Sequence, residues 1–121
     1  SVGFVGWLGI LTGVSEAKLG VSEIGIAFPD AGFGNESRAG IPFVVLLRDI
    51  LKYDKTVEDS IARIQSANRT CDLLLAVGDG KVPAGKEPVV GFRYSESSSM
   101  VLTTQNFLPV NASWHKPIED I

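Results

Sequence analysis

The chain has 121 residues, of which 45% are hydrophobic and 21% are charged, and its formal net charge is -3. This length and composition are those of one folded domain with its own core, which excludes a disordered chain. The mild acidity and the lack of any Lys or Arg run exclude nucleic acid as a partner, because phosphate binding needs a clustered basic surface.

Two strands are predicted in the N-terminal third. Residues 5–11 are apolar and rich in glycine, and residues 12–16 after them have the composition of a turn. Residues 19–26 alternate with period two, which is typical of a strand. Residues 29–40 are dense in Gly, Asn and Asp, and this composition predicts a loop.

Helical spacing follows. Pro42 suits a first helical turn, where its missing N–H removes no bond, and an apolar stripe then recurs at helical spacing at Phe43, Leu47, Ile50 and Leu51. A second helix begins at Thr56, whose hydroxyl can cap the backbone N–H of Asp59. Its predicted buried face is Val57, Ile61 and Ile64. The linker of residues 53–55 is short, which predicts two adjacent, antiparallel helices.

Three more strands complete the chain. Residues 71–77 are almost unbroken apolar, the pattern of a strand covered on both faces, and residues 78–80 read as the turn after it. Residues 88–94 and 100–104 are the last two strands, joined by a serine-rich hairpin loop. The order is therefore β-β-α-α-β-β-β, an α+β fold. If the strand of residues 71–77 is covered twice, helices lie on one side and a second sheet on the other.

Cys71 is the only cysteine, and its thiol could be either a nucleophile or a structural group. A nucleophilic thiol needs a cation or a helix N-terminus to lower its pKa. Cys71 instead begins an apolar strand, where cysteine behaves as a small hydrophobe, so we expect a structural thiol.

Three of the four asparagines stand in N-x-S/T triplets, namely Asn35, Asn68 and Asn111. Such triplets are acceptors for N-glycosylation in secreted proteins. A single cysteine alone would suit a reducing compartment, but three triplets favour a lysosomal or secreted protein.

Several classes of site are excluded by motif. With one His and one Cys, the chain has no zinc site of the ordinary type, and we expect no metal. The glycines form neither a phosphate loop nor a dinucleotide fingerprint, so we expect no cofactor. No apolar stretch is long enough to be a transmembrane segment.

Several segments, in this order, resemble the acid ceramidase and penicillin acyltransferase-like group of N-terminal nucleophile hydrolases. Residues 6–13 and 18–22 look like the paired early strands of that group. Residues 40–42, 48–51 and 56–61 resemble its helix pair, and residues 101–107 resemble the end of a later strand. The resemblance implies an αββα sandwich of four layers. The chain would then be one incomplete portion of a larger domain, with the remainder of its own precursor as a partner.

The resemblance also implies a site. By position, Asn106 looks like the oxyanion-hole asparagine of the group, whose amide would stabilise the charge on the attacked carbonyl oxygen. The sequence departs from the group's pattern at Phe107, where the group has histidine, and Asn106 then reads equally as a residue that ends a strand.

The nucleophile of the group is a cysteine at a new N-terminus, whose free amine serves as its base. It is expected upstream of these residues, with Ser1 as a weaker candidate. The implied activity is hydrolysis of a small-molecule or lipid amide. The alternatives are a non-catalytic glycosylated relative or a secreted interaction module.

Overall fold

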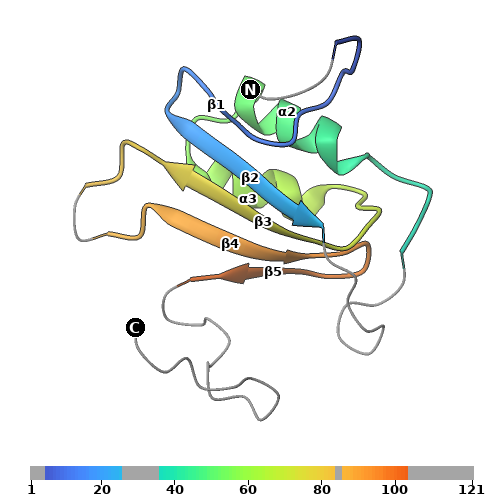
Figure 1. Cartoon of the computed structure of the whole chain (residues 1–121). Helices are drawn as coiled ribbons and strands as arrows, with labels where there is room; N and C mark the ends of the chain where they lie inside the picture. The colour runs from blue at the N-terminus through green and yellow to red at the C-terminus, as the bar shows by residue number, and fades with distance from the viewer. Residues whose placement is uncertain (1–4, 26–35, 84–85, 104–121) are drawn as a thin grey trace, which may run out of the picture.

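The computed structural model describes residues 5–25, 36–83 and 86–103, and within them it is an α+β fold with the predicted element order (Figure 1). The elements are β1 (Gly13–Val14), β2 (Leu19–Gly25), α2 (Phe43–Tyr53), α3 (Val57–Ser66), β3 (Leu73–Asp79), β4 (Val89–Tyr94) and β5 (Ser99–Leu102). The five strands form one antiparallel sheet in chain order, and the helix pair is inserted between β2 and β3.

The register of the sheet places like residues in rows across the strands. Val21 of β2 pairs with Val77 of β3, and Val77 pairs in turn with Val90 of β4. All three are buried, so this row belongs to the face of the sheet that the helices cover. The next row, Ser22, Ala76 and Gly91, points to the opposite face because side chains alternate along a strand.

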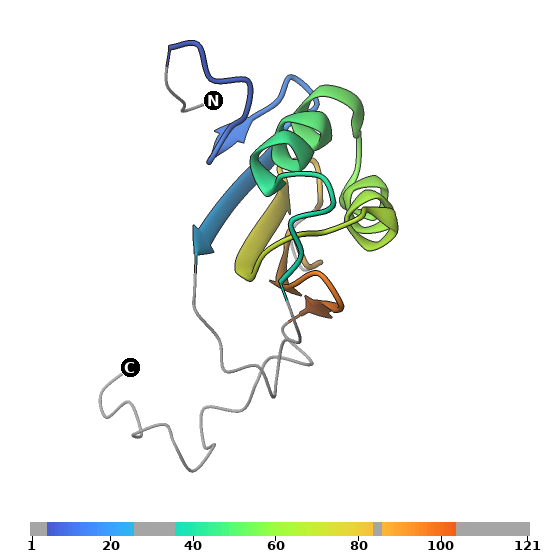
Figure 2. The same ribbon diagram turned by 90° about the vertical axis from the view of Figure 1, so that its right-hand side faces the viewer.

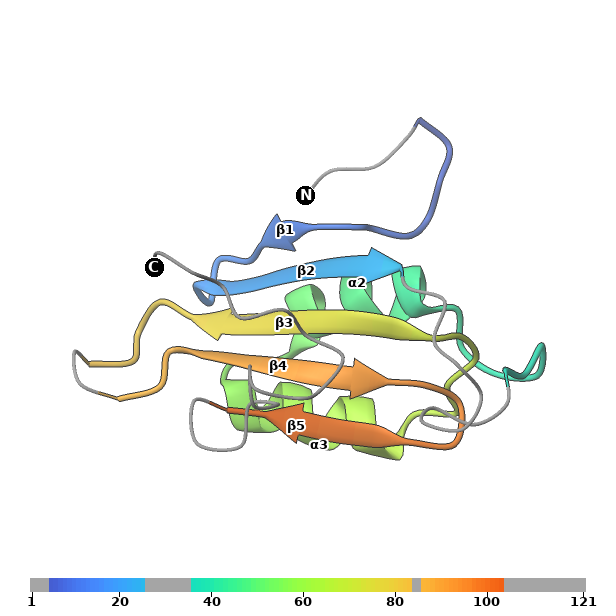
Figure 3. The same ribbon diagram turned by 60° about the horizontal axis from the view of Figure 1, so that its bottom comes forward.

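Both helices lie on one face of the sheet, α2 behind β2 and α3 behind β4 and β5 (Figures 2 and 3). Helix α3 begins with the predicted cap, in which the Thr56 hydroxyl accepts from the N–H of Asp59 and the Asp59 carboxylate accepts from the N–H of Thr56. The N–H of Ile41 donates to the carbonyl of Asn68, which brings the start of α2 beside the end of α3. The helices are therefore antiparallel neighbours, as predicted.

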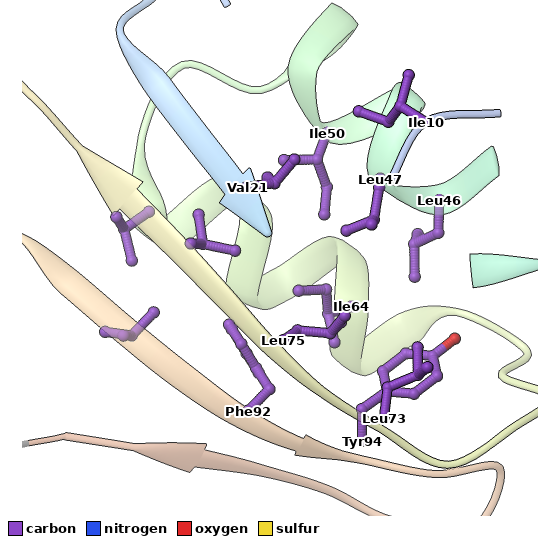
Figure 4. Close-up of a cluster of buried hydrophobic side chains, with 13 residues drawn as sticks. Ile10, Val21, Leu46, Leu47, Ile50, Ile64, Leu73, Leu75, Phe92 and Tyr94 are labelled. Carbon is purple, nitrogen blue, oxygen red and sulfur yellow. The ribbon is translucent and has the colours of Figure 1, made fainter. Parts of the chain in front are cut away.

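The core fills the space between the helices and the sheet (Figure 4). Leu47, Ile50 and Ile64 reach it from the helices, and Val77, Phe92 and Tyr94 reach it from the sheet. All six side chains are fully buried. The predicted helical stripes are confirmed, since Phe43, Leu51 and Ile61 also pack against this core.

Residues 5–11 do not form the predicted strand. Instead, this segment packs against α2: the N–H of Ile10 donates to the carbonyl of Val44 at 3.0 Å. A Cβ on Gly9 would lie 2.5 Å from the Val44 Cβ, so glycine is required for this close approach. The first strand, β1, falls within the predicted turn of residues 12–16. The glycines therefore allow contact with a helix rather than with a neighbouring strand.

Strand β3 is shifted by two residues from the predicted one, and its second face is not covered as expected. Gly78 and Asp79, read as a turn, continue the strand and pair with Gly20 and Leu19. Along β3 the side chains alternate between buried and half-buried. The helices cover one face, and among the described residues no second sheet covers the other.

Candidate functional site

The most distinctive surface is the sheet face that points away from the helices, here called the open face. A groove of about 510 Å³ lies on it, over β1, β2, β3 and the start of β4. It is lined by Thr12, Gly13, Val14, Gly20, Val21, Ser22, Ala76, Gly78 and Val89. Ile24, Val89 and Met100 are 59%, 53% and 40% exposed, although all three are apolar. The open face therefore has a shallow, glycine-lined groove and several exposed apolar side chains, and Arg93, which pairs with Leu74 and Met100, lies on the same face.

The chemistry of this groove is limited by its lining. None of the lining residues carries a titratable side chain, and the only polar side chains are the hydroxyls of Thr12 and Ser22. The Thr12 hydroxyl is already engaged, because it donates to the carbonyl of Val21 at 2.9 Å. Such a surface can hold an acyl chain or another layer of protein, whereas acid, base and nucleophile must come from elsewhere.

Cys71 lies at the edge of the core and is half-buried. Burial raises the pKa of its thiol, and the nearby carboxylates of Glu36, Asp72 and Glu23 raise the pKa further. A hydrogen bond with the Thr70 side chain acts in the other direction but does not reverse the shift. These surroundings are the reverse of those that activate a thiol, so the geometry agrees with the structural role expected from the sequence.

Of the other predicted site residues, only Asn68 lies in the part of the chain that the structure describes. Ser1, Asn106, Asn35 and Asn111 lie outside the described residues. Asn68 is described, and it is exposed in the connection between α3 and β3. Both predicted catalytic residues, Ser1 and Asn106, are thus outside the described residues, and the candidate site among the described residues is the open face.

Three ion pairs among the described residues were not predicted from the sequence, and two of them connect different parts of the fold. The first joins the helices: Arg63 of α3 donates to the carboxylate of Asp54, which directly follows α2 and is buried. In the second, the Lys81 ammonium lies 2.7 Å from the Asp79 carboxylate, whose pKa is lowered by hydrogen bonds from the Lys81 side chain and backbone. Lys81 also donates to the carbonyl of Ala17, so this pair joins the β1–β2 turn to the end of β3. Both pairs connect secondary-structure elements, and none of their residues lines the groove of the open face.

Arg69 has the largest set of hydrogen bonds from one side chain among the described residues. Its guanidinium donates to carbonyls in the last turn of α3 and in the β4–β5 turn, namely those of Ile64, Gln65, Ala67, Ser95 and Glu96. It also lies 6.0 Å from the centre of the Tyr94 ring. The five N–H donors of a guanidinium can satisfy the carbonyls at a helix C-terminus that have no partner within the helix. Arg69 is therefore a structural residue inside the Asn68-Arg69-Thr70 triplet.

The described residues hold neither a cluster of metal ligands nor a helix that could span a membrane. Residues 5–25, 36–83 and 86–103 contain no group of three or more His, Cys, Asp or Glu side chains placed to hold a metal ion. The same residues contain no helix of the length and hydropathy needed to cross a bilayer.

The chain is similar to two proteins of Dictyostelium discoideum. Protein dcd1A is 28% identical over 121 residues, which are all of this chain and 26% of that protein. Protein dcd1B is 36% identical over 76 residues, 62% of this chain and 14% of that protein. The chain thus spans about a quarter of the length of dcd1A, and neither name states an activity.

A weaker similarity extends to the chloroplastic subunit 5 of the NAD(P)H-quinone oxidoreductase of Chlorokybus atmophyticus, at 26% identity over 113 residues. These residues are 92% of this chain and 16% of that protein. No family model and no solved structure matches the chain.

Proposed function

We propose that this chain is part of an amidohydrolase that cleaves linear amide or acyl bonds through an N-terminal nucleophile located outside these 121 residues, in a lysosome or outside the cell. The observation that carries the proposal is the open face. A five-stranded antiparallel sheet with a helical layer on one side and an apolar, glycine-lined surface on the other has the form of one half of an αββα sandwich. The sequence resemblance to the acid ceramidase and penicillin acyltransferase-like group supports the same arrangement.

The described residues act as scaffold in this proposal rather than as chemical groups. The one described thiol, Cys71, has its pKa raised by burial and is a poor nucleophile at neutral pH. The groove is apolar and fits the acyl part of a lipid amide. The chemical step would use an N-terminal nucleophile whose own amine takes its proton, with Asn106 donating to the carbonyl oxygen as it gains charge.

The test uses the complete protein that contains these residues, produced in a secretory host. It is incubated with a fatty-acyl amide of a chromogenic amine, and release of the amine is followed with time. We expect steady turnover, preceded by a burst of about one amine per protein where hydrolysis of the acyl-enzyme is slower than its formation. Asn106→Ala is expected to lower kcat by about 10²- to 10³-fold. Cys71→Ala, the control variant, is expected to keep the wild-type rate.

A second candidate is a non-catalytic protein on the same scaffold, and it is favoured by the lack of an activated nucleophile among the described residues. Labelling separates the two candidates. The folded, complete protein is treated with an electrophilic acyl probe and analysed by peptide mass spectrometry. Labelling of an N-terminal residue supports the amidohydrolase. If the protein neither becomes labelled nor releases amine, the amidohydrolase proposal is overturned and the non-catalytic protein is supported.

A further inference from the structure

We propose that Asn68 carries an N-linked glycan on the helical side of the domain. The inference rests on the secretory setting of the proposed function and not on its chemistry. Asn68-Arg69-Thr70 is an acceptor triplet, and the structure describes all three of its residues. The other two triplets, at Asn35 and Asn111, have their asparagines outside the described residues.

The Asn68 side chain is available, although its backbone is fixed. The residue is exposed in a connection two residues beyond α3. No hydrogen bond among the described residues involves its side-chain amide, and only its backbone carbonyl is engaged, by the N–H of Ile41 at 2.8 Å. A Cβ on Gly40 would lie 2.5 Å from that carbonyl oxygen, so the segment before α2 is packed tightly against the Asn68 backbone. A sugar on the amide nitrogen therefore displaces no hydrogen bond among the described residues, while the backbone under it is held.

The two residues after Asn68 have a different role. The Arg69 side chain points into the fold, where it donates to the carbonyls of α3 and of the β4–β5 turn. Thr70 is half-buried, and its carbonyl accepts from the N–H of Ser37 at 2.8 Å. Within one triplet, the acceptor asparagine is thus the residue that faces solvent, and its neighbours hold the connection in place.

The location of the glycan has a consequence for assembly. The hydrogen bond between Ile41 and Asn68 places the triplet where α2 begins and α3 ends. A bulky, hydrated oligosaccharide at this point keeps that end of the helical layer in solvent. The open face is on the side of the sheet away from the helices (Figure 2), so a glycan on the helical side does not lie over it.

The experiment uses the complete protein, secreted from a eukaryotic host. Peptide N-glycosidase treatment in isotopically heavy water converts each glycosylated asparagine to labelled aspartate, and mass spectrometry then locates the label. We expect the label on Asn68 in most molecules, and Asn68→Gln to remove the mass of one glycan. Thr70→Ser, which preserves the triplet and its hydroxyl, is expected to keep the glycan, whereas Thr70→Val is expected to lose it.

Unmodified Asn68 in the secreted protein overturns the inference, whether or not Asn35 and Asn111 are modified. Stability gives an independent readout. In protein produced without glycans, Asn68→Gln is expected to unfold at the wild-type temperature, and a clear loss would show that the amide is a structural group instead. The amide-cleavage assay on the same preparation separates the two proposals, since a glycosylated but inactive protein contradicts the proposed function alone.

Discussion

The Arg63 guanidinium donates to both oxygens of the Asp54 carboxylate, with Nη2 2.5 Å from Oδ1. The Asp54 side chain is 3% exposed and the Arg63 side chain 34%. Asp54 follows the last residue of α2, and Arg63 lies in the last turn of α3, so the pair fixes the helices against each other. The two partners differ in their access to water, and this asymmetry leads to a prediction.

Removal of Arg63 is expected to be more damaging than removal of Asp54. Arg63→Met leaves a buried carboxylate with no cation, which costs about 2 to 3 kcal/mol of unfolding free energy. Asp54→Asn leaves a guanidinium that can turn to water, and we expect a loss of about 1 kcal/mol. Urea unfolding of both variants measures the difference. Equal losses would show that the pair acts through its mutual attraction and not through desolvation of Asp54.

Asp59 is expected to make helix α3 sensitive to acid. Hydrogen bonds from the backbone N–H groups of Lys55 and Thr56 lower the pKa of its carboxyl below the ordinary value of 3.8. Because the folded-state pKa is the lower one, the carboxylate stabilises the fold above pH 3.8, and that stability is lost as the pH falls through the folded-state pKa. Asp59→Asn should therefore lower Tm at neutral pH, and the gap from wild type should narrow below pH 3.8.

The control for this prediction is Glu58→Gln, which removes a charge from the same helical turn without removing a hydrogen bond from the cap. Its effect on Tm is expected to be smaller than that of Asp59→Asn. Thermal unfolding followed by circular dichroism over a pH series measures both variants. A gap between wild type and Asp59→Asn that stays constant in acid would contradict the cap as its source.

Cys71 is expected to react slowly with alkylating reagents. Its pKa is raised above 9.0 by burial and by nearby carboxylates, so the thiolate is a small fraction of the thiol at pH 7. We expect iodoacetamide to modify Cys71 at least about tenfold more slowly than it modifies a free peptide thiol at the same pH. Mass spectrometry of timed samples gives the rate. Fast modification at neutral pH would contradict the structural role of Cys71 and make it a candidate nucleophile.

The hydroxyl of Tyr94 is buried and has no hydrogen-bond partner among the described residues. Because an unsatisfied buried hydroxyl costs free energy, Tyr94→Phe is expected to stabilise the fold by about 1 kcal/mol. Tyr53→Phe is the matched control, since Tyr53 is 55% exposed and its change should be within about 0.5 kcal/mol. A destabilised Tyr94→Phe variant would show that the hydroxyl makes a bond that stabilises the protein.

Burial also raises the pKa of Tyr94 to about 12, from an ordinary value of 10.0. The folded state therefore holds this proton more tightly than the unfolded chain does, and its contribution to stability is complete below pH 10 and lost as the pH rises toward 12. Tyr94→Phe should remove this part of the alkaline pH dependence. Urea unfolding of wild type and variant between neutral pH and pH 11 checks the expectation.

Much of the fold could be predicted because local signals agree with the tertiary structure. The stripe through Leu47 and Ile50 and the cap at Thr56 depend on spacing within one helix, and both are confirmed. The turn prediction at Gly78 and Asp79 is wrong because turn propensity is a local preference, whereas the pairing of Asp79 with Leu19 depends on a distant strand. An unbroken apolar run likewise does not show that both faces of a strand are buried, since Leu74 and Ala76 are apolar and only half-buried.

The candidate site was less predictable. The floor of the groove on the open face is formed by residues that contribute no side-chain chemistry, such as Gly20, Ala76 and Gly78, and only the sheet register brings them together. The sequence shows Arg69 only as the middle of a glycosylation triplet. Its structural role is not predictable, since its partners are backbone carbonyls and one of these is 27 residues away in the sequence. Backbone acceptors carry no sequence signal, so such a contact becomes visible only in three dimensions.

The position of Arg69 affects how the domain opens. Its side chain joins the last turn of α3 to the turn between β4 and β5, so fraying of that helix end requires the hairpin end to loosen as well. Amide protons in the two segments should then exchange with solvent at similar rates despite their separation in sequence. One cation would make a single cooperative unit from two ends that would otherwise fluctuate independently.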